Sequence, residues 1–280
     1  MAIPIKTLLF IDGLKFAKSD HSLFLADSGE ICGNWQGYIL TSVFQPIFRS
    51  NDPDKVFGYD AFVRCTSPTQ PPVAPDQLFL NAIDQENIIQ LDRLCRTIHL
   101  LNFILLDNQD PLLFLNVNEG LINAVDDNHG SSFRKVIDVL GFSPNRIIIE
   151  LPVSLINQPR QLHFALQNYR LNSLEVAVHI RSTQDLINLT DSSPIHYIKI
   201  DAAFLKSGTT ALDQLNALTT ASGNANIILT DNDEKYNLIG TSKLFLQGHA
   251  YGKPSALAAK FPISAPNQES TIAKSRLQAG

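Results

Sequence analysis

Six short apolar runs of this chain end on a polar side chain, and these polar ends have residue types and spacing that can do chemistry. Two of them, Glu150 and Asp201, are carboxylates, whose oxygens suit hard cations such as magnesium or manganese. His179 is a lone histidine, which at a strand end is more often a hydrogen-bonded pocket residue than a metal ligand. The runs span residues 112–116, 147–150, 176–179, 198–201, 227–230 and 244–247.

Such runs are typical of buried parallel strands, and amphipathic segments lie between them. Strand and helix therefore alternate, with predicted helices at residues 75–106, 133–140, 162–169 and 211–221. In a (β/α)8 barrel the carboxyl ends of the strands form the active site, so the polar ends are expected to converge on one mouth. A doubly wound sheet is the rival architecture for the same alternation.

Length, charge and cysteine content narrow the class of protein. The chain has 280 residues, and a barrel of about 250 residues needs no second domain. A formal charge of -5 leaves no basic excess, which argues against nucleic acid as a partner. Cys32, Cys65 and Cys95 show no CxxC spacing, so we expect reduced thiols, no zinc site and a cytoplasmic protein.

The two ends of the chain differ in character from its middle. Residues 1–36 are predicted to form an N-terminal extension packed on the barrel, built from a short strand, a turn at residues 27–29 and a helix. The apolar stretch at residues 3–10 is short and broken by Lys6, so no membrane insertion is expected. The barrel is assigned to residues 37–264, and the polar residues 265–280 to a flexible tail.

A set of motifs in order carries a family resemblance: Phe44-Gln45-Pro46-Ile47, Gly58 to Arg64, Ile198 to Asp201, and Gln247-Gly248. The set resembles the signature of EAL domains, the phosphodiesterases that open the bacterial second messenger cyclic di-GMP. The resemblance covers roughly residues 38–260 and implies a (β/α)8 TIM-like barrel with one antiparallel strand. In the family, carboxylates, an Asn and a Gln hold two divalent cations, which activate a water for attack on the phosphodiester.

The metal positions of the family are only partly kept. Asp60 stands for the Glu that names the family, and Asn116, Glu150 and Asp201 match further ligands, whereas Val153 replaces the second Glu of the ExTE stretch. The paired aspartates of the DDFGTG run, which bridge the metals, align with His179 and Ile180. Thr230 stands where the AEGVE run has its ligand Glu, and Asp185 lies too far along to substitute. The resemblance therefore implies degenerate remnants, no bound metal, no cofactor and no enzyme activity.

A second set of positions matches the family residues that hold the nucleotide. Lys199 belongs to the KID motif and can pair with Asp201 or with phosphate. An aspartate such as Asp92 can accept hydrogen bonds from a guanine edge, and Arg64 can contact phosphate, although these two could also form a surface ion pair. The residues predicted to bind cyclic di-GMP are Gln45, Asp60, Phe62, Arg64, Asp92, Asn116, Glu150, Lys199, Asp201, Gln247 and Pro254.

Three functions follow from this pattern. The first is a catalytically inactive receptor, which binds cyclic di-GMP without hydrolysis and passes the signal to an unidentified signalling protein in a bacterial cytoplasm. The second is a nucleotide-independent module that docks a protein partner. The third is a weak cyclic di-GMP phosphodiesterase, because Asp60, Asn116, Glu150, Asp201 and Gln247 remain. Because the lost carboxylates make a two-metal mechanism implausible, the receptor is the preferred hypothesis.

Overall fold

The computed structural model describes residues 23–69, 73–82, 84–105, 111–124, 130–181, 195–204, 225–231 and 243–256, with a few single positions besides. The predicted tail at 265–280 and almost all of the predicted helix at 211–221 lie outside these residues, as does most of segment 1–22. The strands are β1 (Leu23–Leu25), β2 (Ile31–Trp35), β3 (Tyr38–Arg49), β4 (Asp52–Thr66), β5 (Leu112–Asn116), β6 (Ile147–Leu151), β7 (Glu175–Ile180), β8 (Tyr197–Asp201), β9 (Asn226–Thr230) and β10 (Leu244–Gln247). The helices are α2 (Pro75–Asn81), α3 (Gln85–Ile104), α4 (Glu119–Ala124), α5 (Ser131–Leu140) and α6 (Pro159–Leu171), with 3-10 turns η1 (Pro144–Arg146), η2 (Val153–Asn157) and η3 (Ala202–Phe204).

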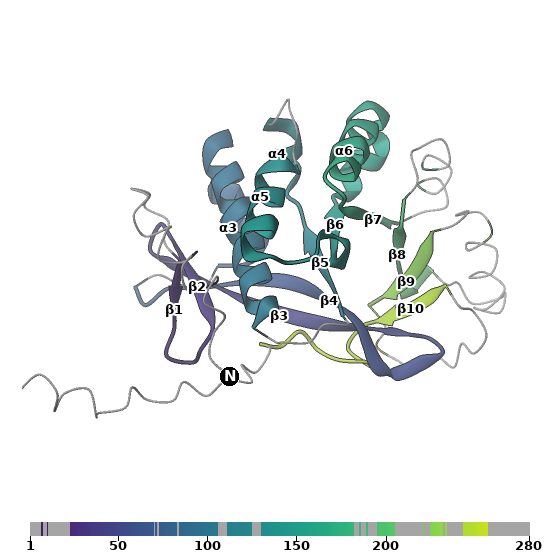
Figure 1. The fold of residues 1–280 in the computed structure, drawn as a ribbon, viewed down its shortest axis with the longest axis horizontal. Helices are drawn as coiled ribbons and strands as arrows, with labels where there is room; N and C mark the ends of the chain where they lie inside the picture. Colours follow the sequence, from purple (N-terminus) through teal and green to yellow (C-terminus); the bar gives the residue numbers. More distant parts are fainter. Residues whose placement is uncertain are drawn as a thin grey trace, which may run out of the picture.

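Within the described part of the chain, eight strands close into a barrel in the order β3-β10-β9-β8-β7-β6-β5-β4, and β4 pairs back onto β3. Strand β3 is antiparallel to both of its neighbours, whereas the strands from β4 round to β10 pair in parallel. Helices α3 to α6 stand on one side of the barrel (Figure 1). The predicted barrel with one antiparallel strand is confirmed, and the doubly wound sheet is wrong.

The strands alternate between two buried layers, as the period of two along a strand requires. One set of side chains meets the helices in the main hydrophobic core, for example Ile149 of β6 and Val178 of β7. The other set points into the barrel and forms a separate cluster of Ile47, Phe114, Ile148, Ala177, Tyr197, Ile228 and Phe245. Because the strands are buried on both faces, their sequences are continuous apolar runs, and this is why the runs predicted the strands so closely.

The N-terminal extension is a hairpin where the structure describes it. The predicted turn is present, since Gly29 adopts φ 84° and donates its N–H to the Ala26 carbonyl. Residues after the turn form strand β2 rather than the predicted helix, and β2 pairs antiparallel with β3, so the hairpin extends the sheet beyond the barrel (Figure 1). Gly33 of β2 packs so closely on α3 that a Cβ there would lie 2.6 Å from Ile98. The division of the chain at residue 36 stays a prediction.

The predicted helix at residues 75–106 is two helices in the structure. Helix α2 ends at Asn81, and α3 begins after Asp84, whose carboxylate caps the new helix by accepting the Asn87 N–H at 2.8 Å. An aspartate in extended conformation is a preferred N-cap, because its side chain satisfies an N–H that the first turn leaves open. Helix α2 contacts β4 and lies next to the cavity described below.

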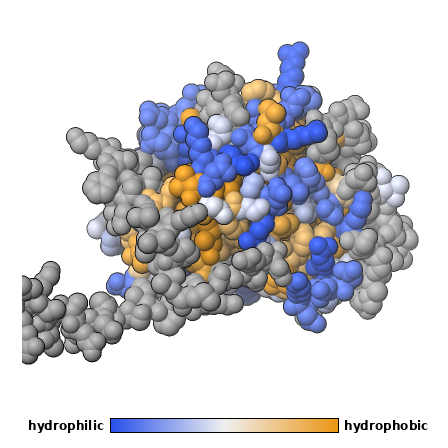
Figure 2. Space-filling view, in the orientation of Figure 1, coloured by the Kyte–Doolittle hydropathy of each residue, from blue (hydrophilic) through white to orange (hydrophobic). Residues whose placement is uncertain are grey.

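The face of the molecule seen in Figure 2 mixes hydrophilic residues with smaller hydrophobic areas. Among the helices that the structure describes, none is both long and apolar enough to cross a membrane.

Candidate functional site at the barrel mouth

A layer of polar side chains closes the barrel directly above its apolar interior. In the parallel strands β5 to β10 the polar residue lies two positions beyond a member of the interior cluster, so it points into the barrel on the same face. In β4 the buried Gly58 occupies the equivalent place, two positions before Asp60. In the antiparallel strand β3 the same relation runs backwards, from Ile47 to Gln45. Each barrel strand thus supplies one member of the layer: Gln45, Asp60, Asn116, Glu150, His179, Lys199, Thr230 and Gln247.

An ion cluster lies at the centre of this layer. The Lys199 ammonium contacts Asp60 Oδ2 at 2.5 Å and also forms an ion pair with Glu150 Oε2. The side chains of Lys199, Asp60 and Glu150 are 2%, 4% and 10% exposed, so water screens these charges poorly. Burial alone would lower the pKa of Lys199, but the two carboxylates outweigh it and raise that pKa above its usual value. Lys199 is therefore a permanent cation between two acids.

The amides of Gln247 and Asn116 contact Asp60, and Gln45 accepts from Gln247. Gln247 Nε2 donates to Asp60 Oδ2 and to Gln45 Oε1, at 3.0 Å in each case. Gln45 in turn donates its amide to the Gly252 carbonyl at 3.1 Å, and Asn116 approaches Asp60 Oδ1 at 3.4 Å. Asp60 thus accepts from donors on three other strands, β5, β8 and β10.

The second carboxyl group of the cluster, that of Glu150, has a raised pKa. Burial is the main influence and raises the pKa of the Glu150 carboxyl; the Lys199 ammonium opposes this, and the Asp60 carboxylate adds to it. The pKa reaches about 7, so Glu150 holds a proton for a substantial part of the time at neutral pH.

At the positions where the resemblance implies bridging aspartates, the two side chains face opposite ways. His179 is half-buried and lies opposite Lys199 in the register of β7 and β8. Burial, together with Lys199 and Arg181, lowers the His179 pKa, and its Nε2 atom is buried without a partner among the described residues. The expectation that His179 is a hydrogen-bonded pocket residue therefore fails at this atom. Ile180 is fully buried in the layer that faces the helices.

The end of β9 keeps the backbone shape of the motif that it resembles. Thr230 is buried and donates its hydroxyl to the Ile200 carbonyl at 3.3 Å. The next residue, Asp231, has φ 53°, a left-handed conformation that favours glycine, and the AEGVE motif has its glycine there. The backbone thus supports the alignment that places Thr230 at the position of the ligand Glu.

Two further carboxylates, one predicted at the site and one excluded from it, accept hydrogen bonds from the backbone. Asp201 does not pair with Lys199; its Oδ1 accepts the Ala203 N–H at 2.8 Å and caps turn η3. Of the two alternatives for Lys199, the ion pair with Asp201 is therefore wrong, because Lys199 pairs with Asp60 and Glu150. Asp185 accepts the backbone N–H of Arg181 at 2.7 Å.

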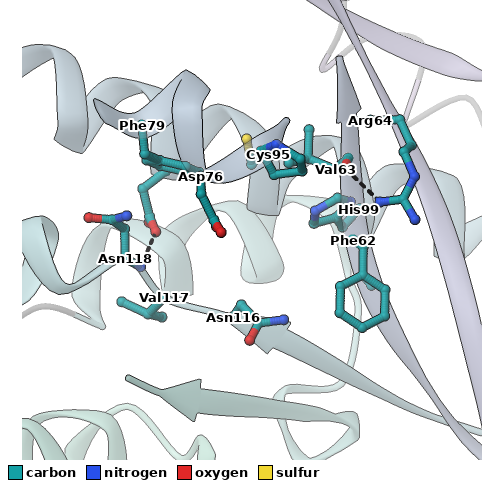
Figure 3. A pocket seen from close by; sticks show the side chains of 13 residues that line it. Phe62, Val63, Arg64, Asp76, Phe79, Cys95, His99, Asn116, Val117 and Asn118 are labelled. Atoms are coloured by element: carbon teal, nitrogen blue, oxygen red, sulfur yellow. Dashed lines mark hydrogen bonds between the residues drawn. The ribbon is translucent and has the colours of Figure 1, made fainter. Parts of the chain in front are cut away.

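A cavity of about 420 Å³ opens beside the polar layer, between β4, α2, α3 and the end of β5. Asp76 and Asn116 extend toward its open centre (Figure 3). Arg64 lies on its rim, is exposed, and among the described residues donates to the neighbouring Val63 carbonyl at 3.0 Å. The structure shows no ion pair between Arg64 and any other residue that it describes. The lining residues are Ala61, Phe62, Val63, Arg64, Pro75, Asp76, Phe79, Asp92, Cys95, His99, Asn116, Val117 and Asn118.

Asp92 lines this cavity, but its carboxylate is already bonded. Its Oδ2 pairs with Arg96, at 2.7 Å from Nε and 2.5 Å from Nη2, and its Oδ1 accepts the Asn118 N–H at 2.8 Å. The side chain is only 2% exposed. The alternative of a surface ion pair between Asp92 and Arg64 is therefore wrong, because Asp92 is buried and pairs with Arg96. Asp92 instead fixes the loop after β5 against α3.

A serine and histidine pair at the same wall escaped the sequence analysis. His99 Nδ1 lies 2.6 Å from the Ser42 hydroxyl, and burial lowers the His99 pKa to about 3, so the ring is neutral. The sequence carried a signal for His99, because Asp92, Cys95 and His99 are spaced by three and four residues and so share one face of α3.

The remaining predicted residues lie at the two sides of the layer. Phe62 is half-buried and belongs to the lining of the cavity. Pro254 is half-buried in the segment after β10, which returns to β3 through the bridge between Phe44 and Ser255. The structure thus brings Gln45, Asp60, Asn116, Glu150, Lys199 and Gln247 into one network and places Phe62 and Arg64 beside it.

The donor set does not fit the pair of divalent cations that the resemblance implies. Among the described residues, no three His, Cys, Asp or Glu side chains gather as a metal-binding group. The two closest carboxylates, Asp60 and Glu150, already share the Lys199 ammonium. His179, Ile180 and Thr230 supply no carboxylate that could add the missing negative charge.

Comparison with known proteins shows the family and agrees with the fold. The model of the EAL domain family matches residues 38–221. The FimX EAL domain from Pseudomonas aeruginosa, solved bound to c-di-GMP, is similar in fold, with a TM-score of 0.62 and 16% identity over 80% of this chain and 93% of that one. The Bacillus subtilis YkuI protein, solved with c-di-GMP and calcium, has a TM-score of 0.61 and 21% identity over 85% of this chain and 63% of that one.

The EAL enzyme Bd1971, solved with cAMP and cyclic di-GMP bound, gives a TM-score of 0.61 at 15% identity. The match covers 89% of this chain and 66% of the Bd1971 chain, so this chain spans slightly less than two thirds of that protein. No curated protein matches this chain in sequence.

Proposed function

We propose that this chain, which belongs to the EAL domain family, binds cyclic di-GMP at its barrel mouth without hydrolysing it. The observation that carries the proposal is the cavity of about 420 Å³, which joins an exposed guanidinium at Arg64 to an aromatic ring at Phe62 and an amide at Asn116. A guanidinium can hold a phosphate through two hydrogen bonds, and an aromatic ring can stack on a base. Structures of related EAL domains with this nucleotide bound support the choice of ligand.

The charge of the mouth is compatible with a dianionic ligand. Two carboxylates and one ammonium leave the cluster of Asp60, Glu150 and Lys199 with a formal charge of -1, and protonation of Glu150 removes even that. Repulsion of the phosphates is therefore weaker than it would be with the full carboxylate ring of the family. Lys199 is neutralised by its partners, so Arg64 is the cation that we assign to phosphate.

The receptor is proposed to act in the cytoplasm of a bacterium and to pass its state to a protein partner. The loop after β5 is the natural route, because Asn118 lines the cavity while its backbone is fixed through Asp92 to α3. A ligand that shifts this loop would alter the surface around α2 and α4, where a partner can bind differently.

We expect no hydrolysis of cyclic di-GMP above background with magnesium or manganese, because His179 and Ile180 replace the bridging aspartates. The measurement is the appearance of linear pGpG by chromatography. Formation in proportion to protein, abolished by Asp60→Ala, would show that the domain is an active phosphodiesterase. Replacing His179 and Ile180 by aspartates should not restore activity, since Thr230 supplies no carboxylate and position 180 faces the helices.

We expect micromolar binding, about -8 kcal/mol, that EDTA does not change. Arg64→Ala should weaken it by ~1.5–3 kcal/mol, a factor of about 10 to 150, because a charge-assisted phosphate contact is lost. Isothermal titration calorimetry measures both values. Arg170→Ala is the matched control, since Arg170 is exposed near the far end of α6, and it should leave the affinity unchanged. No heat at tens of micromolar wild-type protein, with an unchanged melting temperature, would favour nucleotide-independent docking of a protein instead.

A further inference from the structure

We propose that the Lys199 ammonium is an internal counter-cation that takes the place of a divalent metal ion at the mouth of this barrel. It lies between Asp60 and Glu150, the two carboxylates of the polar layer, and contacts both. The inference goes beyond nucleotide binding and does not depend on it. It concerns what balances the buried acids when the chain is folded.

The burial of the three groups makes such a counter-cation necessary. Lys199 and Asp60 are almost entirely shielded from water, and Glu150 is nearly so. Two carboxylates at this depth repel each other strongly unless a positive charge stands between them or one takes up a proton. A cation attached to the chain meets this need without having to be drawn from solution and dehydrated, which magnesium resists.

The hydrogen bonds around Asp60 also leave little room for a competing metal. Its Oδ2 accepts from Lys199 and from Gln247, and its Oδ1 is approached by the Asn116 amide. A divalent ion would have to displace the ammonium and turn at least one amide so that its oxygen faces inward. No further carboxylate in the described layer compensates for that cost, because positions 179 and 230 are His and Thr.

Lys199→Met tests the inference, because Met keeps much of the volume and removes the charge. We expect the melting temperature at pH 8 to fall by roughly 10 °C, since two buried acids lose their counter-charge. Millimolar MnCl₂ should recover a large part of that loss, and EDTA should reverse the recovery. The wild-type melting temperature should respond to neither. Lys253→Met, at an exposed lysine near the mouth, is the matched control and should behave like the wild type.

The double variant Lys199→Met with Glu150→Gln separates charge from packing. It restores the formal charge of -1 to the layer, so it should be more stable than Lys199→Met and should not respond to MnCl₂. Saturable stabilisation of the wild type by MnCl₂ would overturn the inference, even if Lys199→Met does not fold. Two further results would overturn it: a Lys199→Met protein with the melting temperature of the wild type, or a Lys199→Met protein whose melting temperature manganese does not raise.

Discussion

Arg96→Met is expected to lower the free energy of unfolding by about 3–5 kcal/mol, because it leaves a buried carboxylate without its counter-charge. Arg96 and Asp92 are each only 2% exposed and pair one turn apart on α3. The guanidinium also lies 4.8 Å from the centre of the Phe133 ring, so the change removes a cation-π contact between α3 and α5. Equilibrium denaturation at pH 7 measures the loss.

A double variant distinguishes the buried charge from the packing. Asp92→Asn with Arg96→Met removes both charges and leaves an amide oxygen that can still accept the Asn118 N–H, so it should regain most of the stability. The exposed pair of Arg134 and Asp138 has the same spacing on α5, and Asp138→Asn should cost less than about 1 kcal/mol. If Arg96→Met were as mild as Asp138→Asn, the pair would not be desolvated as the structure has it.

The position of Asp92 shows where sequence reasoning reached its limit. The sequence placed Asp92 correctly on a helix, and its side chain does line the cavity. The sequence did not show that Arg96 and the Asn118 N–H would occupy both oxygens of the Asp92 carboxylate. Arg96 lies four residues further on, at the spacing of helical ion pairs, whereas Arg64 comes from a strand whose direction is set by the whole barrel. The partner of Asp92 is therefore the residue at helical spacing, Arg96, and the match of Asp92 to a family position did not indicate this.

The ion-pair partners of Lys199 at the barrel mouth could not be predicted from its motif either. The KID motif places Lys199 and Asp201 two residues apart on β8, so both point to the same side of the strand. Lys199 nevertheless pairs with Asp60 and Glu150, from β4 and β6, because barrel closure brings these strands around it. Contacts across the barrel depend on closure, which no short stretch of sequence encodes.

The strands were the most predictable part of the fold. Strand β5 spans the predicted residues 112–116, and β8 begins one residue before the predicted 198–201. Burial on both faces makes such strands continuous apolar runs, which are readable one at a time. Strand β2 was not readable in this way, because its place beside β3 depends on contacts with α3 that lie far along the chain, such as the pair of hydrogen bonds between Ile31 and Asn102.

The stability of this domain is expected to fall below pH 6.5 through His99. Burial lowers the pKa of the folded-state imidazole from its ordinary 6.5 to about 3. Below pH 6.5 the unfolded chain therefore takes up a proton that the folded chain refuses, and the free energy of unfolding falls until pH reaches about 3. At pH 4.5, two units into this range, the loss from His99 is roughly 2–3 kcal/mol.

Titration of Glu150 changes the stability in the opposite direction over the same pH range. The contribution of His99 is therefore measured as the difference in stability loss between a His99 variant and the wild type. The folded-state pKa of Glu150 is raised to about 7, and protonation on lowering the pH therefore favours the folded state between that value and its ordinary 4.5. His99→Gln removes the titrating ring and keeps a polar group beside the Ser42 hydroxyl. From pH 7 to pH 4.5 it should lose roughly 2–3 kcal/mol less stability than the wild type.

His163→Gln is the control for this difference, because His163 is an exposed histidine on α6. Its loss between the two pH values should match that of the wild type, measured from denaturant midpoints and slopes. Equal losses in His99→Gln and wild type would mean that the ring titrates in the folded state as it does in the unfolded chain. The wall of the cavity would then be open to water at His99, rather than closed by Phe44, whose ring centre lies 6.3 Å from that of the imidazole.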